Sequence, residues 1–360
     1  MSAHNERESS EQEHNGNTHK KNFLSNAYEK HYKAMMIISV LLVLFSFAVI
    51  GIHYAKTGDF VNRGVSLTGG ISLTLPAPKN NVMTQDSLQS YLIQTFPSAD
   101  INVRTFGAAS NLQFSIEASG VDENKLIAAL QPKFPQLTAQ DFANNKQTVG
   151  PTFGASFFTQ TLKALFMAFL FMSIVVFLYF GDSVREKWIA TILTLIAAFM
   201  MFNAKSAITY IIPFIIFVVL IVIYIRDSIP AFGIVLCAFS DLFFSLAIFD
   251  LFGHKLSIAG VAAFLMLVGY SIDTDILLSV RVLKRREGTV FDRVVGALKT
   301  GVTMSVCALI AVLTAYFLTN SIVIKEIMFI LIAGLIGDII FTWIQNAGIL
   351  RWFLERKGWK

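Results

Sequence analysis

Long apolar runs separated by short polar stretches dominate this chain of 360 residues. About 20 consecutive apolar residues suffice for a helix to cross the hydrocarbon core of a bilayer. Such runs occur at about 35–54, 162–180, 207–225, 229–249, 257–280, 301–318 and 327–349. An eighth run, Trp188–Ala204, holds 17 uncharged residues and is at the short limit, so it predicts a crossing or a re-entrant segment. The pattern predicts a polytopic α-helical membrane protein of about eight spans.

One stretch, 56–160, follows a different pattern. Apolar residues alternate with polar ones at Ile71–Leu75, Ile101–Phe106 and Leu112–Glu117, which predicts strands. Two segments, Asp86–Phe96 and Asp122–Phe134, have helical spacing. This order of elements predicts a small α+β domain of ferredoxin-like type with its helices on one face of the sheet. The stretch contains no His, no Cys and no nucleophile-elbow serine, so we expect it to make contacts rather than to catalyse.

These patterns divide the chain into seven segments. We expect a disordered tail at 1–30, a first transmembrane helix at 31–55, the α+β domain at 56–160, a second transmembrane helix at 161–180, a membrane hairpin at 181–225, further transmembrane helices at 226–350 and a tail at 351–360. The first apolar run follows a long polar tail, which favours a membrane anchor over a cleaved signal peptide.

Composition and charge agree with a membrane protein. Hydrophobic residues make up 54% of the chain, charged residues 15%, and the mean hydropathy is +0.60. With eight crossings, 18 of the 29 Lys and Arg residues lie on the side of the termini, which predicts a cell-membrane protein with both termini cytoplasmic and 56–160 extracytoplasmic. The net charge of +5 includes a basic loop at 281–286, which we expect beside anionic membrane lipids. The distribution gives no support to a nucleic-acid partner.

Residues for enzymatic or cofactor chemistry are scarce. The two cysteines, Cys237 and Cys307, lie in different predicted spans and are typical of apolar packing, so we predict neither a disulfide nor a metal site. The chain has no Gly-x-x-x-x-Gly-Lys-Ser/Thr phosphate-binding loop. We therefore expect no cofactor and no enzyme activity, and expect energy to come from an ion gradient or a partner.

Ionisable side chains inside the apolar runs are the candidates for function. A central Asp in a bilayer costs about 2.5–3.5 kcal/mol even on the lowest scales, so such residues often mark a polar path. The candidates for proton coupling are Asp241, Asp273, Asp275, Arg281 and Asp338. If their helices converge, the carboxylates could form a protonatable cluster with Arg281 as a fixed positive charge. The alternative, which stays open, is that each Asp only bonds a Ser or Thr of a neighbouring helix while Arg281 reaches the headgroups.

Helical geometry separates some of these candidates. Asp273 and Arg281 share one helix face about 12 Å apart along the axis. Gly269 lies on the same face and permits close approach of another helix. Asp275 is turned about 200° from Asp273, so both cannot face one partner.

Three motifs resemble those of the SecD/SecF family of protein-export membrane proteins. Val268–Arg281 resembles the fourth-span motif of SecF, and its Asp-Thr-Asp form is similar to the archaeal branch. Val149–Gly154 resembles the Val-Gly-Pro-x-x-Gly motif that ends the first external domain, and Arg63–Gly70 resembles a Gly-x-Asp-Phe-x-Gly-Gly segment. The motif residues are Gly69, Gly70, Gly150, Pro151 and Gly154.

The resemblance implies a membrane fold of the resistance-nodulation-division (RND) superfamily that works with a SecD-like subunit beside the SecYEG channel. It implies export of unfolded polypeptides with the help of the proton-motive force. By motif position, Asp241 is similar to the family's third-span acid and Arg281 to its fourth-span arginine, both associated with proton coupling. Alternatives are an RND-type small-molecule or lipid exporter, or a non-conducting scaffold for SecD.

The chain departs from the family pattern at several positions. Thr274 stands where bacterial members have Asp, and Asp273 where they have Asn. Ser66 and Leu67 replace the usual Asp-Phe. Family members pass from the second span directly into the segment that resembles Tyr224–Phe232, so the apolar segments at 181–225 are interpreted as an inserted hairpin added to six core spans.

Overall fold

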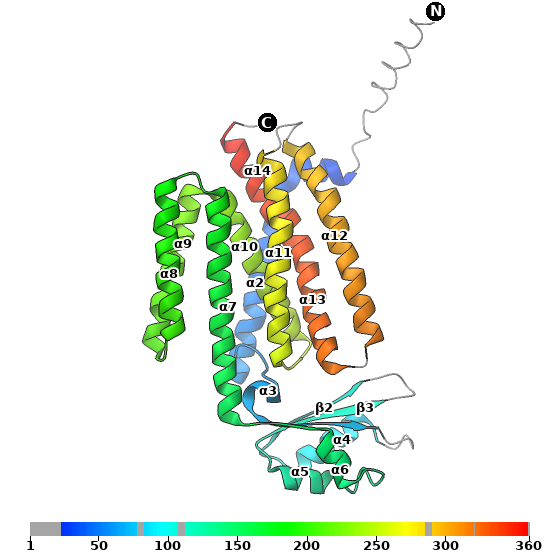
Figure 1. The fold of residues 1–360 in the computed structure, drawn as a ribbon. Helices are drawn as coiled ribbons and strands as arrows, with labels where there is room; N and C mark the ends of the chain where they lie inside the picture. Colours follow the sequence, from blue (N-terminus) through cyan, green and yellow to red (C-terminus); the bar gives the residue numbers. More distant parts are fainter. Residues whose placement is uncertain (1–22, 78–82, 107–111, 285–289, 320, 359–360) are drawn as a thin grey trace, which may run out of the picture.

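A bundle of long helices stands on a small sheet domain in the computed structural model (Figure 1), which describes residues 23–77, 83–106, 112–284, 290–319 and 321–358. We call the end of the bundle nearer the sheet the sheet end and the opposite end the far end. The bundle helices are α2 (Phe23–Thr57), α7 (Pro151–Phe180), α8 (Val184–Asn203), α9 (Ala207–Asp227), α10 (Ile229–Leu251), α11 (Ile258–Lys284), α12 (Val290–Leu318), α13 (Ile322–Ile340), the π-helix η1 (Phe341–Asn346) and α14 (Ala347–Arg356).

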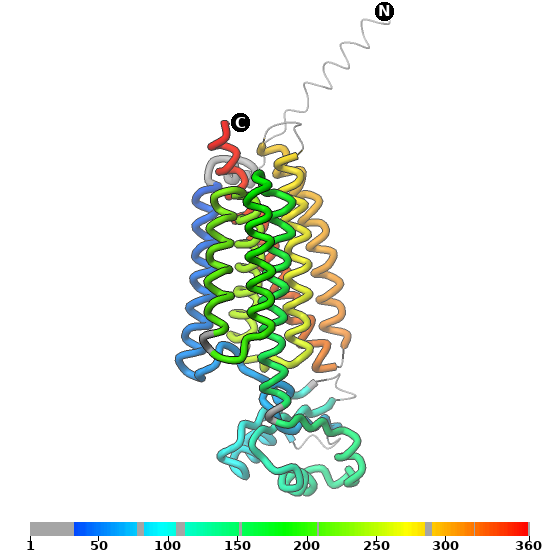
Figure 2. Tube along the Cα trace, turned by 60° about the vertical axis from the view of Figure 1, so that its left-hand side comes forward, coloured from blue at the N-terminus to red at the C-terminus, as the bar shows by residue number. Residues whose placement is uncertain are grey.

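Among the described residues, seven helices are long and apolar enough to cross a membrane. The windows lie in α2, α7, α9, α10, α11, α12 and the continuous α13–α14 segment. The short helix α8 is not among the seven, and its first turn carries Arg185, Glu186 and Lys187. It nevertheless runs beside α9 from the far end toward the sheet end (Figure 1). Because α8 and α9 together return the chain to the far end, α2 begins and α14 ends at that same end. Figure 2 shows the same side-by-side packing after rotation.

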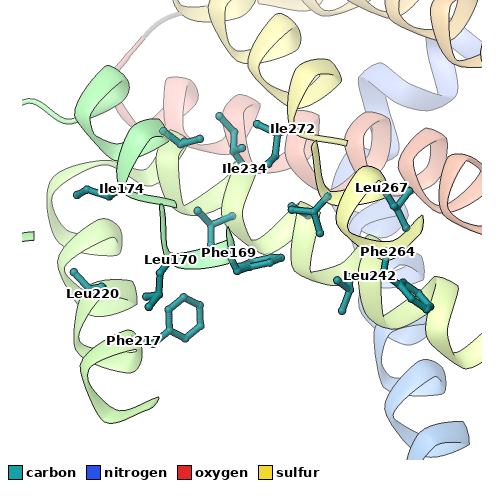
Figure 3. Close-up of a cluster of buried hydrophobic side chains, with 14 of the residues drawn as sticks. Phe169, Leu170, Ile174, Phe217, Leu220, Ile234, Leu242, Phe264, Leu267 and Ile272 are labelled. Carbon is teal, nitrogen blue, oxygen red and sulfur yellow. The ribbon is translucent and has the colours of Figure 1, made fainter. Parts of the chain in front are cut away.

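The centre of the bundle is formed by α10 and α11. In the most apolar 18-residue stretch of α10, 67% is buried, whereas the corresponding share for α12 is 11%. Helix α10 is therefore surrounded by protein, and α12 lies at the margin of the bundle. Phe169 and Leu170 of α7 approach Ile234 and Leu242 of α10 in a continuous apolar core (Figure 3). These contacts hold the helices whose polar residues form the site described below.

The sheet domain has the predicted α+β organisation. Its strands β1 (Gly70–Pro76), β2 (Asp100–Phe106), β3 (Gln113–Ser119) and β4 (Lys146–Val149) are antiparallel in the order β2-β3-β1-β4. That is the ferredoxin-like order read from one edge. The helices α4 (Gln85–Thr95), α5 (Glu123–Leu130) and α6 (Ala139–Asn144) cover the face turned away from the bundle (Figure 1).

Strand alternation gives the sheet one apolar face and one polar face. Leu73 and Ile116 are fully buried in the core of the sheet domain. Their neighbours along the strands, such as Ser72 and Glu117, point to the other face because side chains alternate in a strand. The polar face is turned toward the bundle (Figure 1).

The glycine motifs join the sheet domain to the bundle. Gly70 has φ +143°, and a Cβ there would overlap the carbonyl oxygen of Ala118 on β3. A Cβ on Gly154 would lie 2.9 Å from the backbone of Gly69, so α7 packs closely on the short helix α3 (Val65–Thr68). Pro151 occupies the first turn of α7, which extends outward to the sheet.

A buried carboxylate cluster in the helix bundle

Three of the predicted residues meet in the bundle centre. Asp241 comes from α10, Asp275 from α11 and Asp338 from α13, and their exposed fractions are 1%, 0% and 0%. The sulfur atom of Cys237 and one oxygen each of Asp241 and Asp275 lie within 4.8 Å of one another. We call the three acids the carboxylate cluster. This group of donors is close enough to hold protons or a small cation.

Hydroxyl groups from neighbouring helices donate to the cluster. Ser271 of α11 donates to Asp241, which connects α11 to α10. Asp338 accepts from Thr274 Oγ1 at 2.7 Å and from Ser305 Oγ of α12 at 3.3 Å. Because each bond crosses between two helices, a change in the charge of a carboxylate alters helix–helix contacts directly.

The hydroxyl of Thr342 is shared by two carboxyl groups. Its oxygen lies 3.0 Å from Asp275 Oδ1 and 2.9 Å from Asp338 Oδ1. A hydroxyl has one proton and donates one hydrogen bond at a time. Two ionised carboxyl groups would have to share this proton in a weaker three-centre bond, whereas a protonated carboxyl group donates to Thr342 and satisfies both contacts. The geometry thus provides a place for at least one extra proton.

The π-helix η1 brings several polar side chains to the cluster. Asn346 Nδ2 donates to Asp275 Oδ1 at 2.8 Å, and Gln345 Nε2 donates to Ser240 at 3.2 Å. A π-helical turn is rare and often occurs at functional sites. Sequence reasoning missed Thr342 and Asn346, although these polar residues interrupt the apolar run at 327–349.

Small residues let the helices approach the cluster. A Cβ on Gly337 of α13 would lie 3.4 Å from Asp241 Oδ1, and a Cβ on Gly233 of α10 would lie 2.9 Å from Asn346 Oδ1. In the part of the chain that the structure describes, Asp241 Oδ1 and Asp275 Oδ2 are buried and have no hydrogen-bond partner. The cluster therefore has oxygens that can still accept a proton or a cation.

Two residues predicted on one face of α11 lie away from the cluster. Asp273 and Gly269 are exposed on α11, and no atom of this chain lies within 4 Å of a Cβ built on Gly269. Of the two acids about 200° apart, it is Asp275 that faces the bundle. The grouping of Asp273 with the buried acids is therefore corrected.

Arg281 also lies outside the cluster. Its Nη1 atom donates to the carbonyl of Gly296 at 2.8 Å and to Thr300 Oγ1 at 2.9 Å, both on α12. The expectation that Arg281 supplies a positive charge among the carboxylates is corrected, because its position eight residues beyond Asp273 directs it to α12. Within the described residues, no Lys, Arg or His forms a salt bridge with the three acids.

Known proteins resemble this chain over most of its length. The family "Protein export membrane protein SecD/SecF, C-terminal" matches residues 130–209 and 197–356. The protein-export membrane protein SecF of Methanothermobacter thermautotrophicus is 34% identical, covering 89% of this chain and 90% of the relative. SecF of Pyrococcus furiosus is 32% identical, covering 91% and 93%.

A solved structure supports the fold. The crystal structure of SecDF, a translocon-associated membrane protein from Thermus thermophilus, aligns with a TM-score of 0.57 at 17% identity, covering 91% of this chain and 38% of that one. The predicted SecDF-like membrane fold is confirmed. The chain therefore belongs to the SecD/SecF family of protein-export membrane proteins, and its SecF relatives match it along about nine-tenths of its length.

Proposed function

We propose that this SecF-type subunit of protein export binds and releases protons at the carboxylate cluster. The observation that carries the proposal is the Thr342 hydroxyl, which lies between two fully buried carboxyl groups. Ionised carboxylates without a basic partner are strongly disfavoured in a bundle interior. The number of protons held there therefore sets the charge among α10, α11 and α13, and with it the helix contacts.

The proton-motive force is the energy source in this proposal. Moving one charge through 100 mV supplies about 2.3 kcal/mol. That energy shifts a two-state equilibrium about 50-fold. Two arrangements of packed helices that differ by a few kcal/mol could be exchanged by such a shift.

Arg281 has a positioning role in this proposal. Its bonds to Gly296 and Thr300 join α11 to α12. The same helix α12 carries Ser305, which donates to Asp338. Arg281 therefore supports the helix contact on which one donor of the cluster depends.

The orientation follows from charge in this proposal. Both termini face the cytoplasm, and the sheet domain lies outside. Basic residues at the far end support this, since Arg185 and Lys187 begin α8, Arg226 lies in the last turn of α9, and Arg356 lies in the last turn of α14.

We further propose that the chain acts with a SecD-like subunit beside the SecYEG channel and promotes passage of unfolded polypeptides. The chain spans 38% of the length of the SecDF structure, so a second unit would be needed to complete that length. Exposed apolar residues of α12, such as Met304 and Ile310, leave a surface for a companion helix or for lipids.

The test uses the chain co-purified with its SecD-like companion and reconstituted into vesicles that contain a pH-sensitive dye. We expect Asp241→Asn, Asp275→Asn and Asp338→Asn to abolish proton uptake driven by an imposed potential and to slow export in cells. Asp273→Asn is the matched control, because this acid lies on α11 but is exposed. Its proton uptake should equal that of the wild type.

Other outcomes would favour other functions. Normal export by all three buried-acid variants would favour a scaffold that uses no protons. A homo-oligomer that transports small molecules without a SecD-like companion would favour an exporter. If the vesicles took up sodium ions and not protons under the imposed potential, the cluster would be identified as a cation site.

A further inference from the structure

A polar cleft separates the sheet domain from the bundle. Its volume is about 830 Å³, and it is lined by the polar face of the sheet and by the sheet end of α11 and α13. Lining residues that the argument uses are Glu117, Ser257 and Glu326. A cleft of this size and polarity can hold water, so it brings solvent to the end of the bundle.

Glu326 lies between this cleft and the bundle interior. Its side chain is only 7% exposed, and its Oε1 atom accepts from the backbone N–H of Ser257 at 2.7 Å. A Cβ on Gly260 would overlap this oxygen, so the first turn of α11 makes room for the carboxylate. The bond to Ser257 alone would explain a structural role for Glu326. Its position between the cleft and a buried face of α13 indicates a further role.

One face of α13 leads from Glu326 to the carboxylate cluster. Ile330, Gly334 and Gly337 follow Glu326 at helical spacing, and all of them are buried. Gly337 is the residue that faces Asp241 Oδ1. The face therefore begins at a carboxylate beside the cleft and ends at a carboxylate oxygen of the cluster, over about 17 Å of helix.

Two buried acceptors without partners lie on α10, one in the cluster and the other a helical turn nearer the sheet. Among the described residues, neither Asp241 Oδ1 nor Ser245 Oγ has a hydrogen-bond partner. Ser245 is one helical turn from Asp241 on the side toward the sheet. Leu267 packs against Gly334 between these atoms and Glu326, so apolar atoms close the path in this arrangement.

Charged groups of the sheet domain interact with Glu326. Arg104 of β2 attracts its negative charge, and Glu117 of β3 repels it. Lys146 of β4 lines the same cleft. The sheet domain thus contributes two opposing charges near Glu326, whereas α11 contributes the backbone N–H of Ser257.

We propose that the cleft is the outer mouth of the proton path and that Glu326 is its first proton-accepting group. A hydronium ion in the cleft gives its proton to the Glu326 carboxylate and leaves as water. When Leu267 moves off Gly334, water connects Glu326 with Ser245, and the proton passes to Asp241 Oδ1. The proposal rests on proton binding by the cluster, and it assigns the residue and the side from which protons arrive.

The first experiment measures potential-driven proton uptake by Glu326→Gln in the reconstituted complex. Glutamine keeps an oxygen that accepts from Ser257, so the structural bond is retained while the proton site is lost. We expect uptake to fall about tenfold or more, because a positioned proton-transfer group contributes strongly to rate. Asp86→Asn is the control in the same domain, because this exposed acid of the first turn of α4 does not line the cleft, and it should retain wild-type uptake. If Glu326→Gln took up protons at the wild-type rate, the role of Glu326 would be overturned, whereas proton binding by the carboxylate cluster would not be affected.

The second experiment does not need proton transport. A water-soluble carbodiimide and an amine are added on the sheet-domain side, and modified carboxyl groups are located by mass spectrometry. We expect modification of Glu326 but not of Asp241 or Asp338. An unmodified Glu326 would overturn the inference, whereas a wild-type complex without proton uptake would overturn the proposed function.

Discussion

Lys255 Nζ lies 2.7 Å from Asp100 Oδ2, so the loop between α10 and α11 is ion-paired with strand β2 of the sheet domain. The backbone strengthens this contact, because Gly64 donates to the carbonyl of Leu256 at 2.8 Å and Leu256 donates to that of Asn62 at 2.7 Å. The loop between the two central helices is thereby bonded both to the sheet domain and to the segment that precedes α3. A movement of α10 against α11 is expected to move the domain.

The Lys255–Asp100 pair should contribute little by itself. Asp100 is largely exposed, and exposed ion pairs are worth about 0.2–1 kcal/mol. We expect Lys255→Glu to lower the unfolding free energy by about that amount and the double variant Lys255→Glu/Asp100→Lys to restore it. Thermal unfolding in detergent, arranged as a double-mutant cycle, measures this. A coupling well above this range would show that the pair is shielded from solvent.

Removal of the shared hydroxyl should separate proton binding from folding. We expect Thr342→Val to lower stability by about 1–3 kcal/mol, because buried carboxyl groups lose a partner, and to reduce proton uptake. Thr342→Ser should restore both. Thr303→Val is the control, because the Thr303 hydroxyl is exposed and bonds only the carbonyl of Lys299 in its own helix. Equal uptake by the Val and Ser variants at position 342 would contradict a role for the hydroxyl.

Close packing at Gly334 should be essential for the bundle. A Cβ at this position would overlap Leu267, whereas a Cβ at Gly269 meets no atom within 4 Å. We expect Gly334→Ala to cost about 1–3 kcal/mol through overpacking, and Gly269→Ala to have a much smaller effect. The unfolding midpoint measures the difference. Adding Leu267→Ala to Gly334→Ala should recover part of the loss, and its failure to do so would exclude this contact as the cause.

Acidification should weaken the loop at His254. Burial lowers the pKa of His254 below its ordinary value of 6.5, and the nearby positive charge of Arg104 lowers it further. The unfolded chain therefore takes up this proton more readily than the folded chain, and stability is lost as the pH falls through 6.5. We expect the unfolding midpoint to drop between about pH 7.5 and pH 5.5, on either side of the ordinary histidine pKa.

His254→Gln tests this assignment, because glutamine stays neutral throughout the range. The variant should show a smaller fall in midpoint on acidification than the wild type. An identical fall in both proteins would place the acid sensitivity at other groups.

The spans and the sheet domain follow from residue patterns, but the composition of the cluster does not. Periodicity places Asp273 and Asp275 on opposite sides of one helix, yet it cannot tell which side faces protein, since both have apolar neighbours. The packing of α10 and α13 against α11 decides in favour of Asp275. Arg281 shares a helix face with Asp273, so the same packing directs it to α12 and away from the cluster.

Of the two η1 residues that bond the carboxylates, Thr342 is compatible with α-helical spacing and Asn346 is not explained by it. Thr342 lies four residues after Asp338, which an α-helix also places on one face. Asn346, however, lies in a π-helical segment, where bonds run from residue i to i+5 and the angular spacing changes. No propensity of the residues Phe341–Asn346 indicates such a segment, and its polar side chains bond residues of α10 and α11.

The widened turn at η1 also sets how the chain continues after it. The wide turn takes up one extra residue; if the same residues were wound as an ordinary α-helix, everything downstream would rotate by about 100°. Asn346 would then turn away from Asp275, and the buried face of α14, including Leu350 and Leu354, would leave its contact with α11 and α12. A single extra residue thus adjusts the angular phase between the polar centre and the carboxyl-terminal helix.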